Sequence, residues 1–271
     1  MKSSASLRVC IAGASGRVGR QLVEATTATD DFSISGALVS PTSPYAGASL
    51  DALVPGAGET RITSIVDDAL EGADVLIDFT RAHVALGHVK ACRDRRINVV
   101  MGTTGFDRDQ LNVIAAVAEE VAIVTAANMS IGGSTLIQVA GTIARALCDG
   151  FDVDVVGTHH RTKAELPSGT SIALGEALAA ASGRDLDSCA FYGHGADLSP
   201  RTAGSIGFSS IRGGDTVGEH AVIFSGNGER FEIIHRAFHR SIYAQGSLRA
   251  ARFVAGRRCG LFTMDDVMQM R

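Results

Sequence analysis

A short apolar run, a glycine-rich turn and a helical pattern follow one another at the start of the chain. Residues 7–12 are apolar except for Arg8 and include β-branched residues, which predicts a buried strand. Gly13, Gly16 and Gly19 come next, and residues 20–27 have the pattern of a helix. In a strand–turn–helix unit such glycines permit a tight turn, let a pyrophosphate approach backbone N–H groups and let the helix pack closely on the strand. The unit predicts a parallel α/β fold with a dinucleotide site at its first turn. Because the spacing is Gly-x-x-Gly-x-x-Gly, an ordinary structural turn is the alternative.

Strand and helix patterns go on alternating to about residue 130. The further elements expected are strands at residues 32–39, 74–80, 97–101 and 121–125 and helices at residues 81–96 and 107–120. This alternation predicts a doubly wound, Rossmann-like parallel sheet, in which the turns after the first, fourth and fifth strands line one crevice. Residues 41–65 are rich in Gly, Pro, Ser and Ala and predict a loop with little regular structure.

The pattern changes after residue 130. A long helix is expected to end near Cys148, and a strand at residues 152–157 is followed by a helix at residues 170–182. Three strands without helices between them are then expected at residues 206–212, 220–224 and 230–235. This part predicts a smaller α+β domain with a mixed or antiparallel sheet. The chain should end in a helix at residues 243–256 and a segment that returns to the first domain.

We therefore expect two domains. Residues 1–130, completed by residues 240–271, are the predicted dinucleotide-binding domain, and residues 131–239 are the predicted substrate-binding and oligomerisation domain. The second domain's strands carry enough apolar residues for burial on both faces of the sheet, which indicates a subunit interface. These residues are Val222, Phe224, Ile233 and Ile234.

Composition limits the class of protein. The chain has 271 residues, of which 45% are hydrophobic, and this is enough for sizeable cores. Its net charge is −4 with no basic run, so a small-molecule partner is favoured over nucleic acid. No apolar segment is long enough for a signal peptide or a membrane span, which predicts a cytoplasmic enzyme without a membrane partner. The cysteines are far apart and lack metal-ligand spacing, so we expect reduced thiols and no metal. They are Cys10, Cys92, Cys148, Cys189 and Cys259.

The stretch from Thr158 to Thr170 places basic and titratable side chains next to a helix start. Ser168 or Thr170 can cap the predicted helix, whose first N–H groups and partial positive charge suit a carboxylate or phosphate. Gly169 lets such a group approach closely. The neighbouring cations and histidines are His159, His160, Arg161 and Lys163. The stretch predicts a site for a substrate with more than one negative charge, and a solvated basic loop is the alternative.

The end of the second strand bears on the choice of cofactor. A site that prefers NADH usually has an acid there to bind the ribose 2′-hydroxyl, but residues 39–42 contain none. Arg17 in the glycine turn can pair with a 2′-phosphate, and Ser40 or Thr42 can donate hydrogen bonds to it. The residues favour NADPH modestly over NADH.

Several motifs occur in one order over essentially the whole chain. They are residues 11–20 (IAGASGRVGR), Asp78-Phe79-Thr80, Gly102-Thr103-Thr104-Gly105-Phe106, Ala127-Asn128-Met129-Ser130, His159-His160-x-x-Lys163 with Pro167-Ser168-Gly169-Thr170, Gly214-Asp215-x-Val217-Gly218-Glu219-His220, and Gly260-Leu261-Phe262-x-Met264-x-Asp266-Val267. With these motifs the chain resembles the bacterial dihydrodipicolinate reductases, also called 4-hydroxy-tetrahydrodipicolinate reductases, of diaminopimelate and lysine biosynthesis. The histidine and lysine stretch with Pro-Ser-Gly-Thr is the most specific of the motifs.

The resemblance implies a reaction and an assembly. The reaction would be the NAD(P)H-dependent reduction of 4-hydroxy-tetrahydrodipicolinate to tetrahydrodipicolinate, and the protein would be a homotetramer formed through the sheet of the second domain. A cofactor in one domain and a substrate in the other would imply closure about hinges near Ser130 and His239.

The resemblance also implies roles for individual residues. His159 would donate or accept a proton and Lys163 would donate one. The expected substrate-binding residues are His160, Ser168, Gly169, Thr170 and Thr104. The expected cofactor-binding residues are Gly13, Ala14, Ser15, Gly16, Arg17 and Val18 in the glycine turn, Ser40 after the second strand, and Gly102, Thr103, Thr104, Ala126, Ala127, Asn128 and Met129 at the nicotinamide end.

The chain departs from the family pattern in two places. Many members have an acid followed by an arginine where this chain has Val39 and Ser40, so the family's cofactor preference does not carry over. Members often have Asp-Ala before Pro-Ser-Gly-Thr, where this chain has Glu165-Leu166, and we expect this change to be tolerated.

Two alternatives have different chemistry. A relative of aspartate-semialdehyde or homoserine dehydrogenase is one, but the former needs a nucleophilic cysteine at the crevice, and Cys10, Cys92 and Cys148 fall within predicted strands or helices. A non-catalytic NADP-binding sensor is the other, and the presence of both His159 and Lys163 argues against it.

Overall fold

The computed structural model describes residues 6–147, 150–192 and 200–269. Cys148, where the long helix was expected to end, lies outside the described residues. The chain divides into two compact units, one formed by Met1–Ile131 with Arg240–Arg271 and the other by Gly132–His239. In the part that the structure describes, no helix has both the length and the apolarity that crossing a membrane requires.

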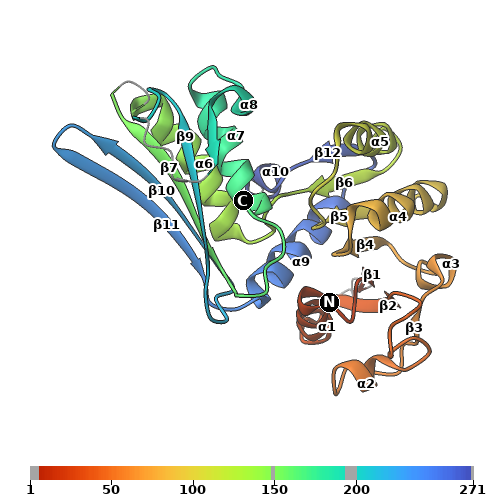
Figure 1. Ribbon diagram of the computed structural model, residues 1–271. Coiled ribbons are helices and arrows are strands. Elements are labelled where there is room, and N and C mark those ends of the chain that lie inside the picture. Colours follow the sequence, from red (N-terminus) through yellow and green to blue (C-terminus); the bar gives the residue numbers. More distant parts are fainter. Residues whose placement is uncertain (1–5, 148–149, 193–199, 270–271) are drawn as a thin grey trace. The chain divides into compact units, whose positions relative to one another are not determined.

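The first unit contains a seven-stranded sheet in which every strand pair is parallel (Figure 1). The strand order is β12-β6-β5-β4-β1-β2-β3. The bounds are β1 Leu7–Ala12, β2 Phe32–Leu38, β3 Ile62–Thr63, β4 Val75–Asp78, β5 Asn98–Met101, β6 Ala122–Thr125 and β12 Gly260–Phe262. The strand order reverses direction beside β1, so the carboxyl ends of β1 and β4 flank the crevice in which such folds bind ligands.

Helices cover both faces of this sheet. They are α1 Arg17–Thr27, α2 Leu50–Leu53, α3 Val66–Ala69, α4 Ala82–Arg95, α5 Arg108–Ala118, α9 Ser241–Ala255 and α10 Met264–Gln269. Val9 and Ile11 of β1 belong to the apolar cluster beneath α1 and α9, whereas Cys10 and Ala12 belong to the cluster beneath α4 and α5. Because alternate residues are buried on opposite faces, β1 is apolar without a break from Val9 to Ala12. The predicted doubly wound, Rossmann-like sheet is confirmed.

The prediction for residues 41–65 was wrong in part. This segment contains α2 and β3, and β3 joins the sheet as an edge strand parallel to β2. Leu50 and Ile62 are buried, and Arg20 of α1 donates hydrogen bonds to the carbonyl of Leu53 at 2.8 Å and to the hydroxyl of Tyr45 at 2.9 Å. These elements have four and two residues, which is too short to produce a recognisable period.

The second unit contains a five-stranded mixed sheet with the order β11-β10-β7-β9-β8. Its elements are α6 Ile131–Leu147, β7 Asp152–His159, α7 Gly169–Ala181, α8 Leu186–Cys189, β8 Ala190–Tyr192, β9 Ile206–Arg212, β10 Gly218–Gly226 and β11 Glu229–Ala237. β9 runs parallel to both neighbours, while β10 is antiparallel to β7 and β11. The predicted mixed sheet is confirmed, and the short elements α8 and β8 were not predicted.

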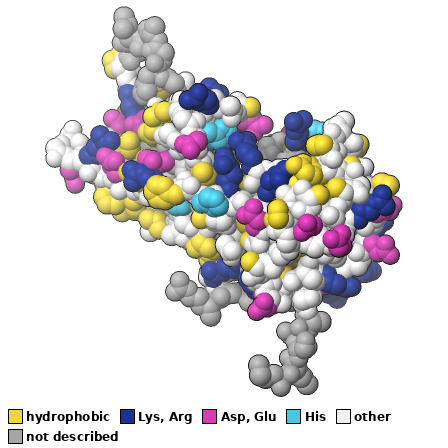
Figure 2. All heavy atoms as spheres, turned by 90° about the horizontal axis from the view of Figure 1, so that it is seen from below, with side chains coloured by type: hydrophobic (Ala, Val, Ile, Leu, Met, Phe, Trp, Pro, Cys, Tyr) yellow, Lys and Arg dark blue, Asp and Glu magenta, His cyan; other side chains and the backbone are white. Residues whose placement is uncertain are grey.

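The two faces of this second sheet differ. Val222 and Phe224 lie on the inner face, where they pack with residues of α6 and α7 in one apolar cluster. Ile233 is paired with Val222 and shares that face, whereas Ile234 is paired with Ala221 and points to the other. On this outer face Ile234 is 40% exposed and Ile211 is 52% exposed. Figure 2 shows hydrophobic side chains gathered on the left-hand part of the surface, over this unit.

Candidate active site

The predicted glycine turn connects β1 to α1 in the first unit. Gly13 has a φ of 81°, and a Cβ at this position would lie 2.5 Å from the carbonyl oxygen of Phe79. The backbone N–H groups of Gly13 and Ala14 both donate to the carbonyl of Leu38, at 2.9 and 3.1 Å. Gly16 is the N-cap of α1 and makes no side-chain cap hydrogen bond. The helix therefore begins with backbone groups that suit an anion. All six predicted residues of the turn lie together at this helix start, namely Gly13, Ala14, Ser15, Gly16, Arg17 and Val18.

A second arginine accompanies this turn. Arg240, the N-cap residue of α9, has a lowered pKa because of its burial and, next, because of the positive charge of Arg17. The positive charges of Arg17, at the start of α1, and Arg240, at the start of α9, act on each other, and such guanidinium groups suit a phosphate-bearing ligand. Sequence reasoning missed Arg240, since it lies far along the chain and only the fold brings it to the first turn.

Ser40 lies just beyond the end of β2 and is exposed. Its hydroxyl is 3.0 Å from that of Thr42 and accepts the Thr42 backbone N–H at 3.3 Å. The two hydroxyl groups named from the sequence are thus next to each other in one turn. This turn follows Leu38, whose carbonyl accepts the N–H groups of the glycine turn.

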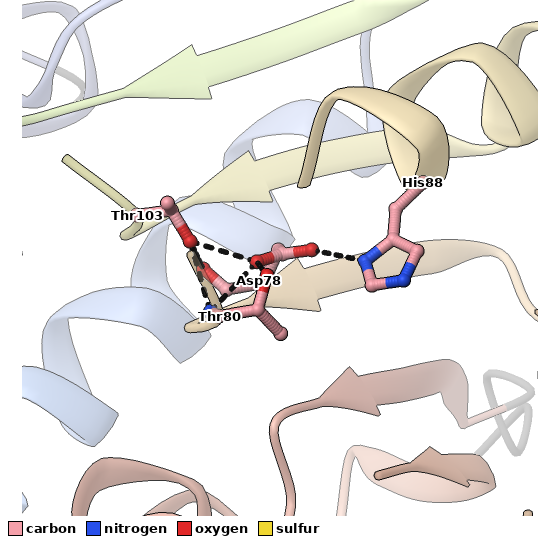
Figure 3. A network of polar contacts seen from close by, with 4 residues as sticks. All are labelled: Asp78, Thr80, His88 and Thr103. Carbon is pink, nitrogen blue, oxygen red and sulfur yellow. Dashed lines mark hydrogen bonds and ion pairs between the residues drawn. The ribbon is translucent and has the colours of Figure 1, made fainter. Parts of the chain in front are cut away.

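Asp78 forms a buried polar network at the carboxyl end of β4 (Figure 3). One carboxylate oxygen lies 2.6 Å from Nδ1 of His88 on α4. The other accepts hydrogen bonds from the backbone and hydroxyl of Thr80 and from the hydroxyl of Thr103, at 2.9, 2.7 and 2.8 Å. The Thr103 hydroxyl also accepts the Thr80 backbone N–H at 2.9 Å. The network joins the turns that follow β4 and β5, and no sequence pattern pointed to His88 as a member of it.

The network determines which groups of the turn after β5 can contact a ligand. Because the hydroxyl of Thr103 is bound inside the protein, this residue offers only its backbone. The side chain of Thr104 is exposed. A Cβ at Gly102 would clash with the Phe79 ring, so glycine is required for the close approach of the two turns.

The turn after β6 is also held from inside. Asn128 accepts hydrogen bonds from the backbone and the hydroxyl of Ser130, both at 2.8 Å. Met129 is buried in the core beneath α9, and its carbonyl packs against Gly246 of that helix. Ala126 and Ala127 are half-buried. The predicted residues 126–129 form a turn whose polar and apolar side chains are mostly directed inward.

In the second unit, His159 occupies the last position of β7 and is 5% exposed. Its Nε2 atom is buried and has no hydrogen-bond partner among the described residues. Burial lowers the pKa of His159 to about 4, and the charges of Lys163 and His160 act in the same direction. The imidazole is therefore neutral near pH 7 in the protein alone.

The loop after His159 carries the other basic side chains. Nδ1 of His160 lies 3.0 Å from the hydroxyl of Thr162, and the backbone N–H of Lys163 donates to the carbonyl of His160 at 3.0 Å. Lys163 is half-buried, and its carbonyl accepts a hydrogen bond from Arg212 Nε at 2.9 Å. Arg212, at the end of β9, was not predicted to have a role. It fixes the loop that presents Lys163.

Ser168 is the N-cap of α7 and accepts the backbone N–H of Ser171 at 3.1 Å. Of the two caps considered from the sequence, Ser168 is correct, and Thr170 lies within the first turn of the helix. Gly169 is the first residue of α7. The start of this helix and the two histidines at the end of β7 belong to the same unit, as the predicted anion site requires.

Two family models match the chain. The model described as dihydrodipicolinate reductase, N-terminus, matches residues 7–129, and the model described as dihydrodipicolinate reductase, C-terminus, matches residues 132–268. The chain belongs to the dihydrodipicolinate reductase family. The resemblance stated from the motifs is thereby confirmed.

Individual relatives agree with this membership. A 4-hydroxy-tetrahydrodipicolinate reductase of Thiobacillus denitrificans is 46% identical over 98% of this chain and 100% of the relative, and one of Nitrosospira multiformis is 44% identical over 98% and 99%. Among solved structures, a dipicolinate-bound dihydrodipicolinate reductase from Paenisporosarcina sp. TG-14 has a TM-score of 0.72 at 22% identity and covers 95% of this chain and 97% of its own. An amine dehydrogenase from Mycobacterium smegmatis shares the fold with a TM-score of 0.66.

Membership of this reductase family implies a nicotinamide cofactor. The first unit fits such a group in two respects. A Cβ at Gly13 would fill the space beside the Phe79 carbonyl, and the start of α1 carries a glycine cap with Arg17 and Arg240 nearby. Among the described residues, no group of three or more His, Cys, Asp or Glu side chains is arranged to hold a metal ion.

Proposed function

We propose that the chain catalyses the NAD(P)H-dependent reduction of 4-hydroxy-tetrahydrodipicolinate to tetrahydrodipicolinate, a step of diaminopimelate and lysine biosynthesis. The match of both family models, over residues 7–129 and 132–268, carries this proposal. The curated relatives that bear the name of this reductase support it, because their similarity extends over nearly the whole chain.

The substrate is a dicarboxylate, and the second unit offers groups that suit it. We assign the backbone of Gly169 and Thr170 at the start of α7, together with His160, to the carboxylates. A helix start stabilises negative charge through its N–H groups and its dipole. Ser168 supports this site as the cap of α7, since its hydroxyl is already bonded to Ser171 and His220. Thr104 of the first unit, whose side chain is exposed, is retained as a further substrate contact.

His159 and Lys163 are assigned to proton transfer. Without substrate, burial and the charge of Lys163 hold the pKa of His159 at about 4, so the ring is neutral but a weak base. A bound dianion would raise this pKa towards neutrality, where an imidazole transfers protons efficiently. Lys163 carries donors only and is the residue suited to give a proton to the reduced ring.

The nicotinamide supplies the hydride when it is bound, and residues of the first unit are assigned to hold it. The glycine turn would contact the pyrophosphate, and residues 102–104 and 126–129 would contact the nicotinamide end. We propose NADPH over NADH, because Arg17 lies at the start of α1 and Ser40 stands where an acid would repel a 2′-phosphate.

The cofactor preference is testable with Ser40→Asp. We expect wild-type kcat/KM to be higher with NADPH, and we expect Ser40→Asp to lower the NADPH value about 10-fold through charge repulsion, while the NADH value changes little. Thr27→Asp, at the far end of α1, is the control. Equal kcat/KM for the two cofactors in the wild type, or a preference for NADH, would remove the NADPH proposal.

The catalytic assignment is testable with three variants in the same assay. His159→Ala and Lys163→Ala should lower kcat by roughly 10²–10⁴-fold, as expected when a positioned acid or base is lost, with nearly unchanged NADPH affinity. Lys163→Arg keeps the positive charge but does not release a proton, so its kcat should also be low. Lys90→Ala changes an exposed lysine of α4 and serves as the control. Wild-type kcat in any of the first three variants would remove that residue's role.

Assembly and location remain predictions. We propose a homotetramer formed through the outer face of the second sheet, where Ile211 and Ile234 are exposed. The cytoplasmic location predicted from the sequence stays a prediction, and a cell-fractionation experiment with the native protein tests it.

A further inference from the structure

The motif that ends in His220 has no part in the proposed reaction, yet this histidine is only 3% exposed. It lies on β10, directly opposite Gly157 of β7. Its ring therefore points to the inner face of the sheet, the same face as His159, which is two residues beyond Gly157. A buried histidine in this position must have polar partners or bear the cost of leaving its nitrogens unbonded.

Ser168 is one of these partners. Nε2 of His220 lies 2.8 Å from the Ser168 hydroxyl, which is also 3.1 Å from the backbone nitrogen of Ser171 and 3.0 Å from its hydroxyl. Burial, with a further contribution from His159, lowers the pKa of His220 to about 3, so the ring is neutral near pH 7. A neutral imidazole and a hydroxyl each have both a donor and an acceptor. Ser168 can therefore satisfy Ser171 and His220 together, and its hydroxyl is held in the capping position.

His220 also packs directly against the ring of His159. The rings of His159 and His220 meet edge to face, with centroids 5.1 Å apart and an interplanar angle of 65°. The space around them is full, because a Cβ at Gly157 would lie 2.9 Å from the Ser171 hydroxyl and 3.4 Å from Nε2 of His159. His159 has little freedom to turn while His220 is in place.

We propose that His220 is a positioning residue of the substrate site, which fixes the start of α7 through Ser168 and the ring of His159 through direct packing. This inference rests on the proposed function, since that function assigns the start of α7 to the substrate carboxylates. His220 itself touches neither substrate nor cofactor in this arrangement. It acts through the residues that it contacts, namely Ser168, which caps α7, and His159.

Two substitutions separate the hydrogen bond from the general packing. In His220→Gln the amide reaches the position of Nε2 and can replace either a donor or an acceptor. In His220→Asn the amide reaches only the position of Nδ1 and cannot contact Ser168. The probe is dipicolinate, an aromatic dicarboxylate, and its dissociation constant is measured by calorimetry beside that of NADPH.

We expect His220→Asn to weaken dipicolinate binding about 10-fold, with the same factor in the KM for substrate, and His220→Gln to remain within about 2-fold of the wild type. Ser168→Ala should give a similar loss, and the double variant Ser168→Ala/His220→Asn should be no weaker than either single variant, because both act along one path. NADPH affinity should stay unchanged throughout. His83→Asn, at an exposed position of α4, is the control.

The outcomes distinguish the two proposals. Absence of dipicolinate binding by the wild type would count against the proposed function. If the wild type binds dipicolinate and His220→Asn binds it with the same affinity, the role of His220 is overturned. It is also overturned if the fold-losses in affinity of the two single variants multiply in the double variant. If His220→Asn does not fold, Ser168→Ala and His220→Gln decide: a loss in the first with retention in the second supports the inference, and any other combination overturns it.

Discussion

Both carboxylate oxygens of Asp78 are engaged with side chains or backbone of other residues. Thr80 and Thr103 come from the turns after β4 and β5, so one buried carboxylate ties the β5 turn, which the proposed cofactor site uses, to the turn after β4. His88 closes the network from α4. Removing this carboxylate leaves the buried hydroxyl of Thr103 and the buried ring of His88 without their partner, which costs free energy.

Asp78→Ala should therefore destabilise the protein strongly. Removing one member of a buried charged network typically costs about 3–5 kcal/mol, and we expect a loss of this size in the free energy of unfolding by urea. Asp94→Ala removes a carboxylate whose ion pair with Arg93 is exposed, and it should change stability by less than about 1 kcal/mol. If Asp78→Ala were as stable as Asp94→Ala, the network would not contribute to the free energy of unfolding.

The two buried histidines predict how stability depends on pH. The pKa of His220 falls from 6.5 to about 3 and that of His159 to about 4, mainly through burial. As pH falls below about 6.5 the unfolded chain binds protons that the folded protein does not, so the free energy of unfolding must decrease. One such group contributes a slope of up to about 1.4 kcal/mol per pH unit.

His220→Gln removes one of these groups, so its stability should decrease less steeply than that of the wild type between about pH 6 and pH 4. Urea unfolding at several pH values provides the two slopes. Parallel curves would mean that His220 does not have a lowered pKa in the folded protein.

At the scale of elements, α9 packs on the turn after β6 through a glycine. A Cβ at Gly246 would clash with the carbonyl of Met129, which belongs to the backbone and cannot move aside cheaply. Gly87 of α4 is a helical glycine with nothing within 4 Å of the position of a Cβ. The two positions form a matched pair.

Gly246→Ala should lower the free energy of unfolding by about 1–3 kcal/mol or more through overpacking, whereas Gly87→Ala should raise it by about 0.5–1 kcal/mol through helix propensity. Thermal and urea unfolding of both variants give the comparison. Equal stabilities would contradict the close approach of α9 to the β6 turn.

The sequence predicted long elements well because their patterns are strong. The strand at residues 7–12 has the bounds of β1, and the helix predicted at residues 81–96 agrees with α4, Ala82–Arg95. The capping box of α5, in which Asp107 and Gln110 bond each other's backbone, supports the cap expected at Asp107. The short α2 and β3 owe their form to burial of Leu50 and Ile62 against the rest of the unit, which no local pattern reveals.

In the candidate site, too, local sequence patterns could be recognised and long-range contacts could not. Residues close together in sequence, such as His159 and Lys163, were proposed from the basic stretch beside a predicted helix start and from the family motif. The contacts of Ser168 with His220 and of Asp78 with His88 join distant segments and depend on how the fold arranges its strands and helices. Register is a property of the whole sheet, so these partners became visible only in the structure.

At the scale of the whole molecule, the outer face of the second sheet predicts the assembly. Ile211 and Ile234 are exposed there, and we expect the wild type to have the mass of a tetramer by light scattering coupled to size exclusion. Ile234→Arg should reduce that mass by placing a charge in the interface. Leu261→Arg changes an exposed residue of β12 in the first unit and should leave the mass unchanged. A monomeric wild type, or a tetrameric Ile234→Arg, would contradict this interface.

The most direct test of the account follows the hydride itself. The purified protein is given NADPH that carries deuterium in place of both hydrogens at nicotinamide C4. The substrate is the compound formed by condensation of pyruvate and aspartate semialdehyde. The mass of the reaction product is then measured by mass spectrometry. We predict that NADPH absorbance falls only when this substrate is supplied, and that the tetrahydrodipicolinate formed contains one deuterium. No loss of absorbance, or a product without deuterium, would contradict the proposed reduction.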